Sequence, residues 1–261
     1  MEEKIITSHQ NEQIKQLAKL RQKKYRDEKG LYLIEGYKIL QEALKSGEEI
    51  VDLVYDKSME GAAKDIAAEN KLLVTTAILD GLSALKSPQK ILASVRRKAE
   101  TFVLTGSRWI LLDRISDPAN AASIVRSADC AGFDGVIFAN QSVDCYNEKF
   151  LRGAMGSNFH LPLVQAASLT DTVAQFRKAG FVVIGSALDG DKPMDVSDKK
   201  VLLIVGNESA GMSKEAKACC DAVIKIPIYG KAESMNVACA ATVLMYLTTG
   251  LFVLPDSNGQ G

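Results

Sequence analysis

The sequence predicts an α/β fold with a parallel sheet, and two observations support this fold class. Near-continuous runs of Val, Ile and Leu alternate with helical segments in the second part of the chain, which is typical of strands buried on both faces. The chain has 261 residues and 47% hydrophobic content, which is enough to bury a sizeable core. We therefore expect a soluble globular protein of one large or two ordinary domains.

The first part of the chain, roughly residues 1 to 100, predicts a small α/β unit of its own. Residues 11–30 carry Ile14, Leu17 and Leu20 at helical spacing and end at a glycine, which predicts one helix. Strand, helix, strand and helix are then predicted at 31–36, 37–47, 49–56 and 60–71. Residues 85–108 contain a proline and a basic run, and we place the boundary or a connecting arm within them.

In the second part, longer apolar strands alternate with helices from Trp109 onward. The predicted strands are 109–115, 134–139, 181–188, 201–206 and 222–228. The predicted helical segments are 119–132, 169–180, 213–220 and 234–247. This alternation is what predicts the parallel sheet.

Polar segments follow three of these strands, namely SDPAN (116–120), NESAGMS (207–213) and YGKAESMN (229–236). Ligands of open parallel sheets bind at the carboxyl ends of the strands, so these segments are candidate site residues. Each segment leads into a predicted helix, whose first N–H groups can bind a polar ligand. Ser, Asn and Asp are also ordinary helix N-caps at such positions, and both interpretations stay open from the residues alone.

Taken together and in this order, residues 111–132, 202–213 and 226–241 resemble the three signature motifs of the SpoU (TrmH-like) family of RNA ribose 2′-O-methyltransferases, in the SPOUT superfamily. Residues 144–164 resemble the linking stretch of that family, and residues 11–44 are similar to the substrate-binding extension of many members. The resemblance implies a trefoil-knotted α/β methyltransferase domain at 101–261. It also implies a smaller RNA substrate-binding domain at 1–100 with an α/β, ribosomal-protein L30e/L7Ae-like fold, S-adenosylmethionine as cofactor, and a homodimer formed through the knotted domain.

The same resemblance assigns roles to polar and apolar residues of the motifs. The catalytic candidates are Arg126, Asn120, Glu208, Ser234 and Asn236. The cofactor-binding candidates are Gly206, Ile226 and Met235, with Ala187, Leu188 and Ile228 as weaker ones. Alternative interpretations are core packing for Ile226 and Met235, a solvated helix residue for Arg126 and a first-turn acid for Glu208. Because a guanidinium is a poor proton acceptor at neutral pH, we expect Arg126 to bind the ribose hydroxyl and a neighbouring phosphate.

A basic cluster in residues 15–29 is the candidate RNA-binding surface, since net charge is zero and any nucleic acid must bind a local patch. The candidates are Lys19, Lys23, Lys24 and Arg26, together with Arg152 in the linking stretch, and Arg96, Arg97 and Lys98 extend the patch. The alternative is a solvated helix face.

Ala122 and Ala154 depart from the family pattern, which has Gly and Ser there. His9 and His160 lack an acid partner at a telling spacing and are interpreted as structural or solvated.

The predicted reaction is 2′-O-methylation of a ribose in RNA, with ribosomal RNA preferred over transfer RNA as substrate. A non-catalytic RNA-binding or ribosome assembly factor that keeps the fold is the alternative from another class. The five cysteines form no CxxC pair and no metal-ligand spacing, so we expect reduced thiols and no metal. The N-terminus lacks the features of a signal peptide and no apolar run reaches about 18 residues, which predicts a cytoplasmic protein without a membrane span.

Overall fold

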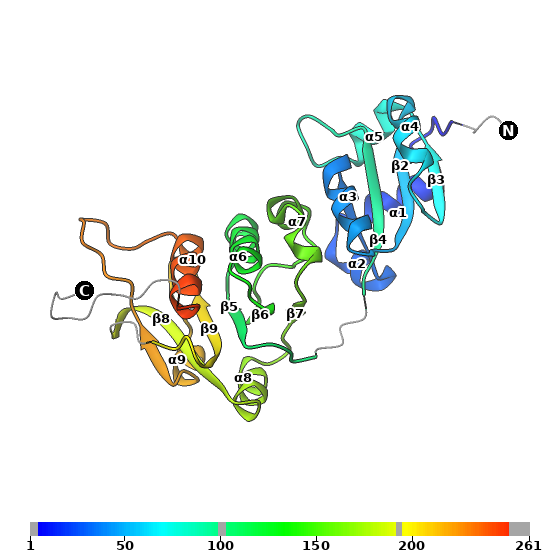
Figure 1. Ribbon diagram of the computed structural model, residues 1–261. Helices are drawn as coiled ribbons and strands as arrows, with labels where there is room; N and C mark the ends of the chain where they lie inside the picture. The colour runs from blue at the N-terminus through cyan, green and yellow to red at the C-terminus, as the bar shows by residue number, and fades with distance from the viewer. Residues whose placement is uncertain (1–4, 99–102, 192–194, 251–261) are drawn as a thin grey trace. The chain divides into compact units, whose positions relative to one another are not determined.

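The computed structural model describes residues 5–98, 103–191 and 195–250, and the chain divides into two compact units (Figure 1). The first unit comprises Met1–Ala99 and Tyr146–Phe159, and the second comprises Glu100–Cys145 and His160–Gly261. Residues 146–159 therefore pack with the first unit, although they lie in the middle of the second part of the sequence. Among the described residues, no helix is long and apolar enough to cross a membrane.

The first unit is built on a four-stranded sheet of order β1-β4-β2-β3. Its strands are β1 (Leu31–Glu35), β2 (Ile50–Tyr55), β3 (Asn70–Leu73) and β4 (Ile91–Arg96). Its helices are α1 (Glu12–Lys19), α2 (Lys23–Lys29), α3 (Tyr37–Lys45), α4 (Glu60–Lys64), α5 (Thr76–Leu82) and α7 (Glu148–Ala154), with single 3₁₀ turns at Lys57–Met59 and Ser157–Phe159. β4 pairs antiparallel with both β1 and β2, so residues interpreted from sequence as a connecting arm form a central strand.

The predicted helix over 11–30 is two helices that meet at a tight turn. Asn11 caps α1, and α2 ends at Gly30, which has a left-handed backbone (φ 63°). Between the helices, Arg26 Nη1 donates to the carbonyls of Leu20 at 2.9 Å and Arg21 at 2.8 Å. Arg26 is only 4% exposed, because its guanidinium satisfies carbonyls that the end of α1 leaves unpaired.

Helix α7 contributes apolar residues to the core of the first unit. Asn147 caps it by accepting from the N–H of Lys149, and Phe150, Leu151 and Ala154 are buried. Just before the helix, the ring of Tyr146 lies 4.9 Å from that of Tyr32. These contacts explain why the segment belongs with the first unit.

The second unit contains a six-stranded sheet of order β10-β8-β9-β5-β6-β7, which is parallel throughout and confirms the predicted fold class. Its strands are β5 (Arg108–Asp113), β6 (Gly135–Ala139), β7 (Leu163–Gln165), β8 (Phe181–Asp191), β9 (Lys200–Gly206) and β10 (Ala222–Ile224). Its helices are α6 (Pro118–Cys130), α8 (Leu169–Lys178), α9 (Lys214–Ala218) and α10 (Val237–Thr248). The chain builds β6 and β7 on one side of β5, and β9 pairs with β5 on the other side, so the strand order reverses there.

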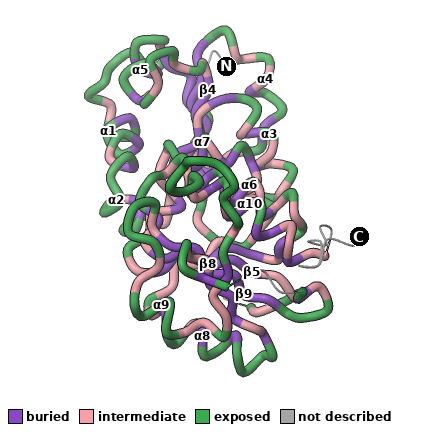
Figure 2. Tube along the Cα trace, turned by 90° about the vertical axis from the view of Figure 1, so that its left-hand side faces the viewer, coloured by how far each residue is buried: buried purple, intermediate pink, exposed green. Residues whose placement is uncertain are grey.

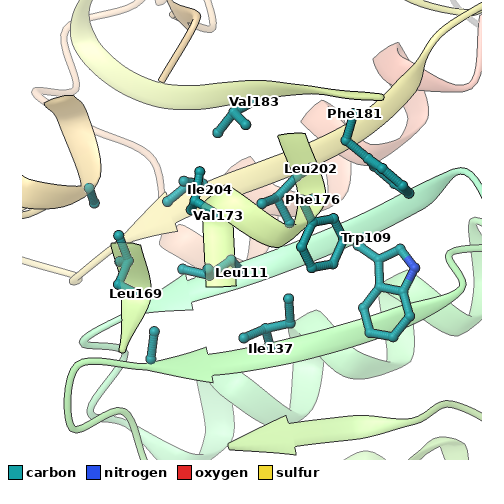
Figure 3. Close-up of a cluster of buried hydrophobic side chains, with 12 residues drawn as sticks. Trp109, Leu111, Ile137, Leu169, Val173, Phe176, Phe181, Val183, Leu202 and Ile204 are labelled. Carbon is teal, nitrogen blue, oxygen red and sulfur yellow. The ribbon is translucent and has the colours of Figure 1, made fainter. Parts of the chain in front are cut away.

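Helices cover both faces of this sheet, with α6 and α10 on one face and α8 and α9 on the other (Figure 1). The strands are accordingly buried in Figure 2, as near-continuous aliphatic runs predict. Figure 3 shows the core under α8, where Phe176 lies edge-on to Trp109 with ring centroids 5.6 Å apart. A Cβ on Gly135 would lie 2.3 Å from the Trp109 ring, so only glycine leaves room for this indole on β6.

Candidate functional site

The carboxyl ends of β5 and β9 lie side by side, because their register runs from Arg108 opposite Val201 to Asp113 opposite Gly206. On the far side of β9, the register between β8 and β10 shifts between Gly185 and Asp191, so residues 186–190 leave the ladder. The segments after β5 and β9, residues 186–190 and the segment before α10 therefore surround one edge of the sheet. This edge is where a parallel sheet of this kind binds ligands.

A pocket of about 480 Å³ opens at this edge, a size that suits a small organic ligand. All six predicted cofactor-binding residues line it: Gly206, Ile226, Met235, Ala187, Leu188 and Ile228. Of the predicted catalytic residues, Glu208 and Ser234 line it. Leu188, Ile228 and Met235 are exposed apolar side chains, so they are available to a ligand and are not part of the core. Further lining residues that the sequence did not single out include Asp189, Asn207 and Lys217.

The carboxylate of Glu208 joins the first two polar segments. Its Oε1 accepts from Asn120 Nδ2 at 3.1 Å and from the N–H of Asp117 at 3.2 Å. Its Oε2 accepts from Asn207 Nδ2 at 3.1 Å and from Ser116 Oγ at 3.3 Å. Burial alone would raise the pKa of Glu208, but these donors and its own backbone N–H outweigh burial and hold that pKa below its ordinary value. The group is therefore a charged acceptor at neutral pH and not a general acid.

Asn236 ties the third polar segment to the first. Its Nδ2 donates to Asn120 Oδ1 at 3.1 Å, while its Oδ1 accepts from the N–H groups of Ala238 at 2.9 Å and Cys239 at 3.3 Å. The residue is thus the N-cap of α10, and its side-chain amide also bonds to the first polar segment. Asn120, Glu208 and Asn236 form one hydrogen-bonded chain across all three motifs.

Asn207 organises the loop after β9, and the sequence analysis included it in the polar segment 207–213 without giving it a role of its own. Its Nδ2 also donates to the carbonyl of Arg114 at 2.9 Å, and its Oδ1 accepts from the N–H groups of Ser209 and Ala210 at 3.1 Å. Its backbone pairs in both directions with Gly211 at 3.0 Å. The available signal was its place as the first polar residue after a buried strand.

Gly206 is required by this loop geometry. A Cβ at this position would lie 2.1 Å from the N atom of Met212 and 2.2 Å from the carbonyl carbon of Gly211. Both are backbone atoms, so they cannot move aside as a flexible side chain would. The loop folds directly onto Gly206, and this close approach shapes the wall of the pocket.

Arg126 is not part of the hydrogen-bonded chain around Glu208. It is exposed on α6 and is not among the lining residues of the pocket. Ala119, Ser123 and Cys130 are exposed on the same helix at spacings of three and four residues from one to the next, so they share its face. Ala122 is fully buried and is not among the lining residues, so its methyl group does not narrow the pocket.

The basic cluster of the first unit is only partly available to a ligand. Lys19 and Lys24 place their ammonium groups 5.8 and 5.7 Å from the centroid of the Tyr25 ring, and Lys23 pairs with Asp27 at 2.7 Å. Arg26 is a correction to the sequence prediction, because its buried guanidinium serves the turn between α1 and α2. Arg152 is exposed on α7 and belongs to the same unit.

The basic run after β4 also differs from expectation, because its side chains are engaged in ion pairs. Arg96 pairs with Glu49 at 2.6 Å and Glu69 at 2.5 Å. Arg97 pairs with Asp27, and Lys98 pairs with Glu48. These pairs bind β4 to its neighbours.

Two expectations about titratable side chains are also refined. His160 does have an acid partner, because its Nδ1 lies 2.8 Å from Asp129 Oδ2 at the end of α6. Spacing in the sequence did not indicate this pair, because the two residues are 31 positions apart.

Burial raises the pKa of the Cys220 thiol to about 12, which makes it a poor nucleophile. Within the described residues, no cluster of His, Cys, Asp and Glu is arranged to hold a metal ion.

Comparison with known proteins extends these observations to sequence families. Residues 107–246 match the SpoU rRNA Methylase family, and residues 11–93 match the MRM3-like substrate binding domain. The 23S rRNA (guanosine(2553)-2′-O)-methyltransferase RlmP of Bacillus subtilis is 34% identical over 250 residues, which cover 95% of this chain and 100% of that protein. The 23S rRNA (uridine(2479)-2′-O)-methyltransferase of Streptomyces viridochromogenes is 31% identical over 236 residues, 83% of this chain and 82% of that protein.

Solved structures with similar folds include two that hold AdoMet. The SpoU methyltransferase AviRb from Streptomyces viridochromogenes, in complex with the cofactor AdoMet, has a TM-score of 0.83 at 30% identity and covers 93% of this chain and 98% of its own. The AdoMet-bound rRNA methyltransferase from Sinorhizobium meliloti also has a TM-score of 0.83 at 30% identity, covering 96% and 99%.

Proposed function

Because the chain belongs to the SpoU rRNA methylase family, we propose that it transfers the methyl group of S-adenosylmethionine to a ribose 2′-hydroxyl of ribosomal RNA. The observation that carries this proposal is the hydrogen-bonded chain of Asn120, Glu208 and Asn236, which joins the three motifs beside a pocket of suitable size. Relatives that match most of this chain are named as 23S rRNA 2′-O-methyltransferases, which favours ribosomal over transfer RNA.

The pocket suits S-adenosylmethionine in its shape and its charge. Ile226, Ile228 and Met235 offer an apolar wall, while Glu208 and Glu233 supply negative charge that favours a cationic ligand. The cofactor, when bound, supplies an activated methyl group on a sulfonium. The protein then has to hold this group in line with the ribose oxygen, and no metal or covalent intermediate is needed for such a displacement.

Arg126 is the residue that we assign to the RNA in this reaction. Its permanent positive charge suits a phosphate and the oxygen of the attacking hydroxyl, and it is unsuited to accept a proton. Asn120, Glu208 and Asn236 hold the motif loops in place around the pocket, and Ser234 lines it. Because Arg126 is exposed and outside the pocket lining of its own protomer, a second protomer is the simplest means of completing the site.

A homodimer formed through the exposed face of α6 and α10 meets this requirement. Ser127 Oγ and Thr242 Oγ1 lie 2.7 Å apart and hold the two helices together. Beside this contact, α10 exposes Cys239 and Val243, and α6 exposes Ala119, Ser123, Arg126 and Cys130. Small and apolar side chains around one arginine are suited to close helix packing between two copies.

Four further features belong to this proposal. We assign a trefoil knot to the second unit and an L30e-like fold to the first. The boundary near residue 100 then separates an RNA substrate-binding domain from the methyltransferase domain, in line with the match of residues 11–93 to a substrate-binding domain. We also propose that the enzyme works in the cytoplasm, where ribosomal RNA of bacterial relatives is found.

The test is a methylation assay with tritiated S-adenosylmethionine and three RNAs: total 23S rRNA, 16S rRNA and bulk tRNA. We expect label in ribosomal RNA at a ribose position, located by mapping 2′-O-methylation in cells with and without the gene. Label in tRNA alone would reassign the substrate. Binding of RNA without any methyl transfer would favour the assembly-factor alternative.

A further inference from the structure

One exposed ion pair lies on the wall of the pocket, which apolar residues such as Ile226, Ile228 and Met235 also line. Lys217 Nζ on α9 lies 2.7 Å from Asp189 Oδ2 in the segment that leaves the β8 ladder. Both residues line the pocket, and their side chains are 46% and 72% exposed. The hydrogen bond to Lys217 lowers the pKa of Asp189, so the carboxylate is charged at neutral pH. None of the three motifs includes either residue.

The charges of the pocket make this pair significant for ligand recognition. Among the described lining residues, Asp189, Glu208 and Glu233 are acids, and Lys217 is the one base. S-adenosylmethionine carries a sulfonium, an ammonium and a carboxylate. The two positive groups suit an acidic pocket, but the carboxylate needs a cation or N–H donor, and Lys217 is the cation that the lining supplies.

The pair can open without disturbing the fold. An ion pair between exposed side chains contributes little to stability, because water solvates both groups well and the pair restricts two flexible side chains. Lysine has a long stem and three rotatable donors, so its ammonium can move to a new acceptor nearby. Asp189 lies in a segment without strand pairing to β10, so its position is not needed for the ladder.

We propose that Lys217 and Asp189 recognise the amino-acid end of S-adenosylmethionine, with the ligand carboxylate binding Lys217 and the ligand ammonium binding Asp189. The protein ion pair is then exchanged for two pairs of the same kind with the ligand. This inference rests on the proposed function and adds the residues that distinguish a zwitterionic methionine group from a plain nucleoside.

Calorimetric titration of the full chain with three ligands tests the assignment. S-adenosylmethionine and S-adenosylhomocysteine carry the amino-acid group, whereas 5′-methylthioadenosine has the same adenosine and lacks it. We expect Lys217→Gln to weaken the first two ligands about tenfold, the loss of one charge-assisted hydrogen bond at an exposed site, and to change 5′-methylthioadenosine by less than about twofold. Asp189→Asn should show the same selectivity with a smaller loss.

Two further variants separate recognition of the ligand from a purely structural role of the ion pair. Lys214→Gln changes an exposed lysine of the same helix that does not line the pocket, and we expect all three affinities to stay at the wild-type value. The double change Asp189→Lys with Lys217→Asp keeps an ion pair but reverses it, so a purely structural pair would be restored. We expect thermal stability to stay close to the wild-type value in this variant, and S-adenosylhomocysteine binding to stay weak.

The outcomes distinguish this inference from the proposed function. Equal loss of all three ligands in Lys217→Gln, or full recovery of binding in the reversed pair, would overturn the assignment while leaving the methyltransferase function in place. A wild-type chain that binds none of the three ligands would overturn both.

Discussion

Glu208 holds the site together through a single carboxylate. Donors from three separate segments converge on it, namely the loop after β5, the start of α6 and the neighbouring Asn207. A carboxylate that accepts several hydrogen bonds is stabilised in its charged form, and its net effect here is a lowered pKa despite burial. Protonation of the Glu208 carboxylate would therefore weaken the hydrogen bonds that hold the loops of the first two motifs together.

The change Glu208→Gln should reveal this link as a pH-dependent loss of stability. At pH 7 we expect the free energy of unfolding to fall by about 1 kcal/mol, the lower end for hydrogen bonds to a charged group because Glu208 is partly exposed. The folded-state pKa is lowered, so the wild-type advantage is present above the ordinary value of 4.5 and is lost as the pH falls below it. Urea unfolding of both proteins from pH 7 to pH 3.5 measures this difference. A gap that widens in acid would contradict the assignment.

Arg126→Ala should separate chemistry from cofactor binding. Because Arg126 lies outside the pocket lining, the affinity for S-adenosylmethionine should stay within about twofold of wild type, while methyl transfer falls by about 100-fold or more. Single-turnover methylation and calorimetry measure the two quantities. Lys178→Ala, an exposed basic residue at the end of α8, is the matched control and should leave both unchanged. Transfer at the wild-type rate in the arginine variant would remove Arg126 from the mechanism.

Much of the candidate site was predictable at the scale of single residues. The remainder was not predictable, because it depends on contacts between segments that are far apart in sequence. The pocket residues and the Asn120, Glu208 and Asn236 chain came from motifs that are short and contiguous in sequence. Lys217, Asp189 and the pair of His160 with Asp129 depend on contacts between segments 28 and 31 positions apart. Spacing patterns carry no information on such contacts. Arg26 was predicted wrongly, because a charged residue in a basic run was expected on the surface and is buried.

At the scale of elements, the loop after β9 depends on the absence of a side chain at Gly206. We expect Gly206→Ala to lower the free energy of unfolding by roughly 2 kcal/mol and to weaken cofactor binding, because the added Cβ meets backbone atoms that cannot relax locally. Gly230→Ala is the control, since a Cβ there has no atom within 4 Å, and its stability should change by less than about 0.5 kcal/mol. Thermal unfolding and calorimetry measure both variants. Equal effects of the two changes would show that the loop is not packed as described.

The two helices at the start of the chain divide the basic residues into two classes. Replacing Lys19, Lys23 and Lys24 with Ala should weaken RNA binding and flatten its salt dependence, since each lost phosphate contact lowers the slope by roughly 0.7 to 0.9. Arg26→Ala should leave the slope unchanged and lower the free energy of unfolding by about 2 kcal/mol, because two carbonyls lose a charged donor. A salt titration of RNA binding and a urea unfolding curve for each variant measure these effects. An unchanged slope in the triple variant would make the lysines a solvated helix face.

Elements were predicted best where the strands are long and buried on both faces. β5, β6 and β9 agree with their apolar runs to within two residues at either end. β4 was missed because Pro88 before it and the basic residues after it are features of a linker, whereas ion pairs with Glu49 and Glu69 neutralise Arg96 in the sheet. β7 has three residues and too short a pattern to detect. The split of α1 from α2 depends on Arg26, whose hydrogen bonds to two carbonyls favour a turn where periodicity favoured a continuous helix.

At the scale of the whole molecule, the proposed homodimer can be broken by one charge on its contact face. Val243→Asp places a carboxylate on an exposed position of α10, and we expect a monomer by light scattering and a loss of methyl transfer with the fold retained. Val103→Asp makes the same change at another exposed valine of the second unit, one that belongs to neither α6 nor α10, and should leave the dimer intact. A Val243→Asp dimer as stable as wild type would place the interface elsewhere.

Helix α7 also has a consequence for how the two halves of this protein can be inherited or exchanged. Its buried Phe150 and Leu151 complete the core of the first unit, although their codons lie within the gene segment for the second. A chimera that takes residues 1–100 from a relative through one crossover near residue 100 would unite an α7 and a β1 that never evolved together. A working hybrid must carry both stretches, 5–98 and 146–159, from the same parent. Recombination between such genes is therefore expected to succeed mainly at paired crossovers.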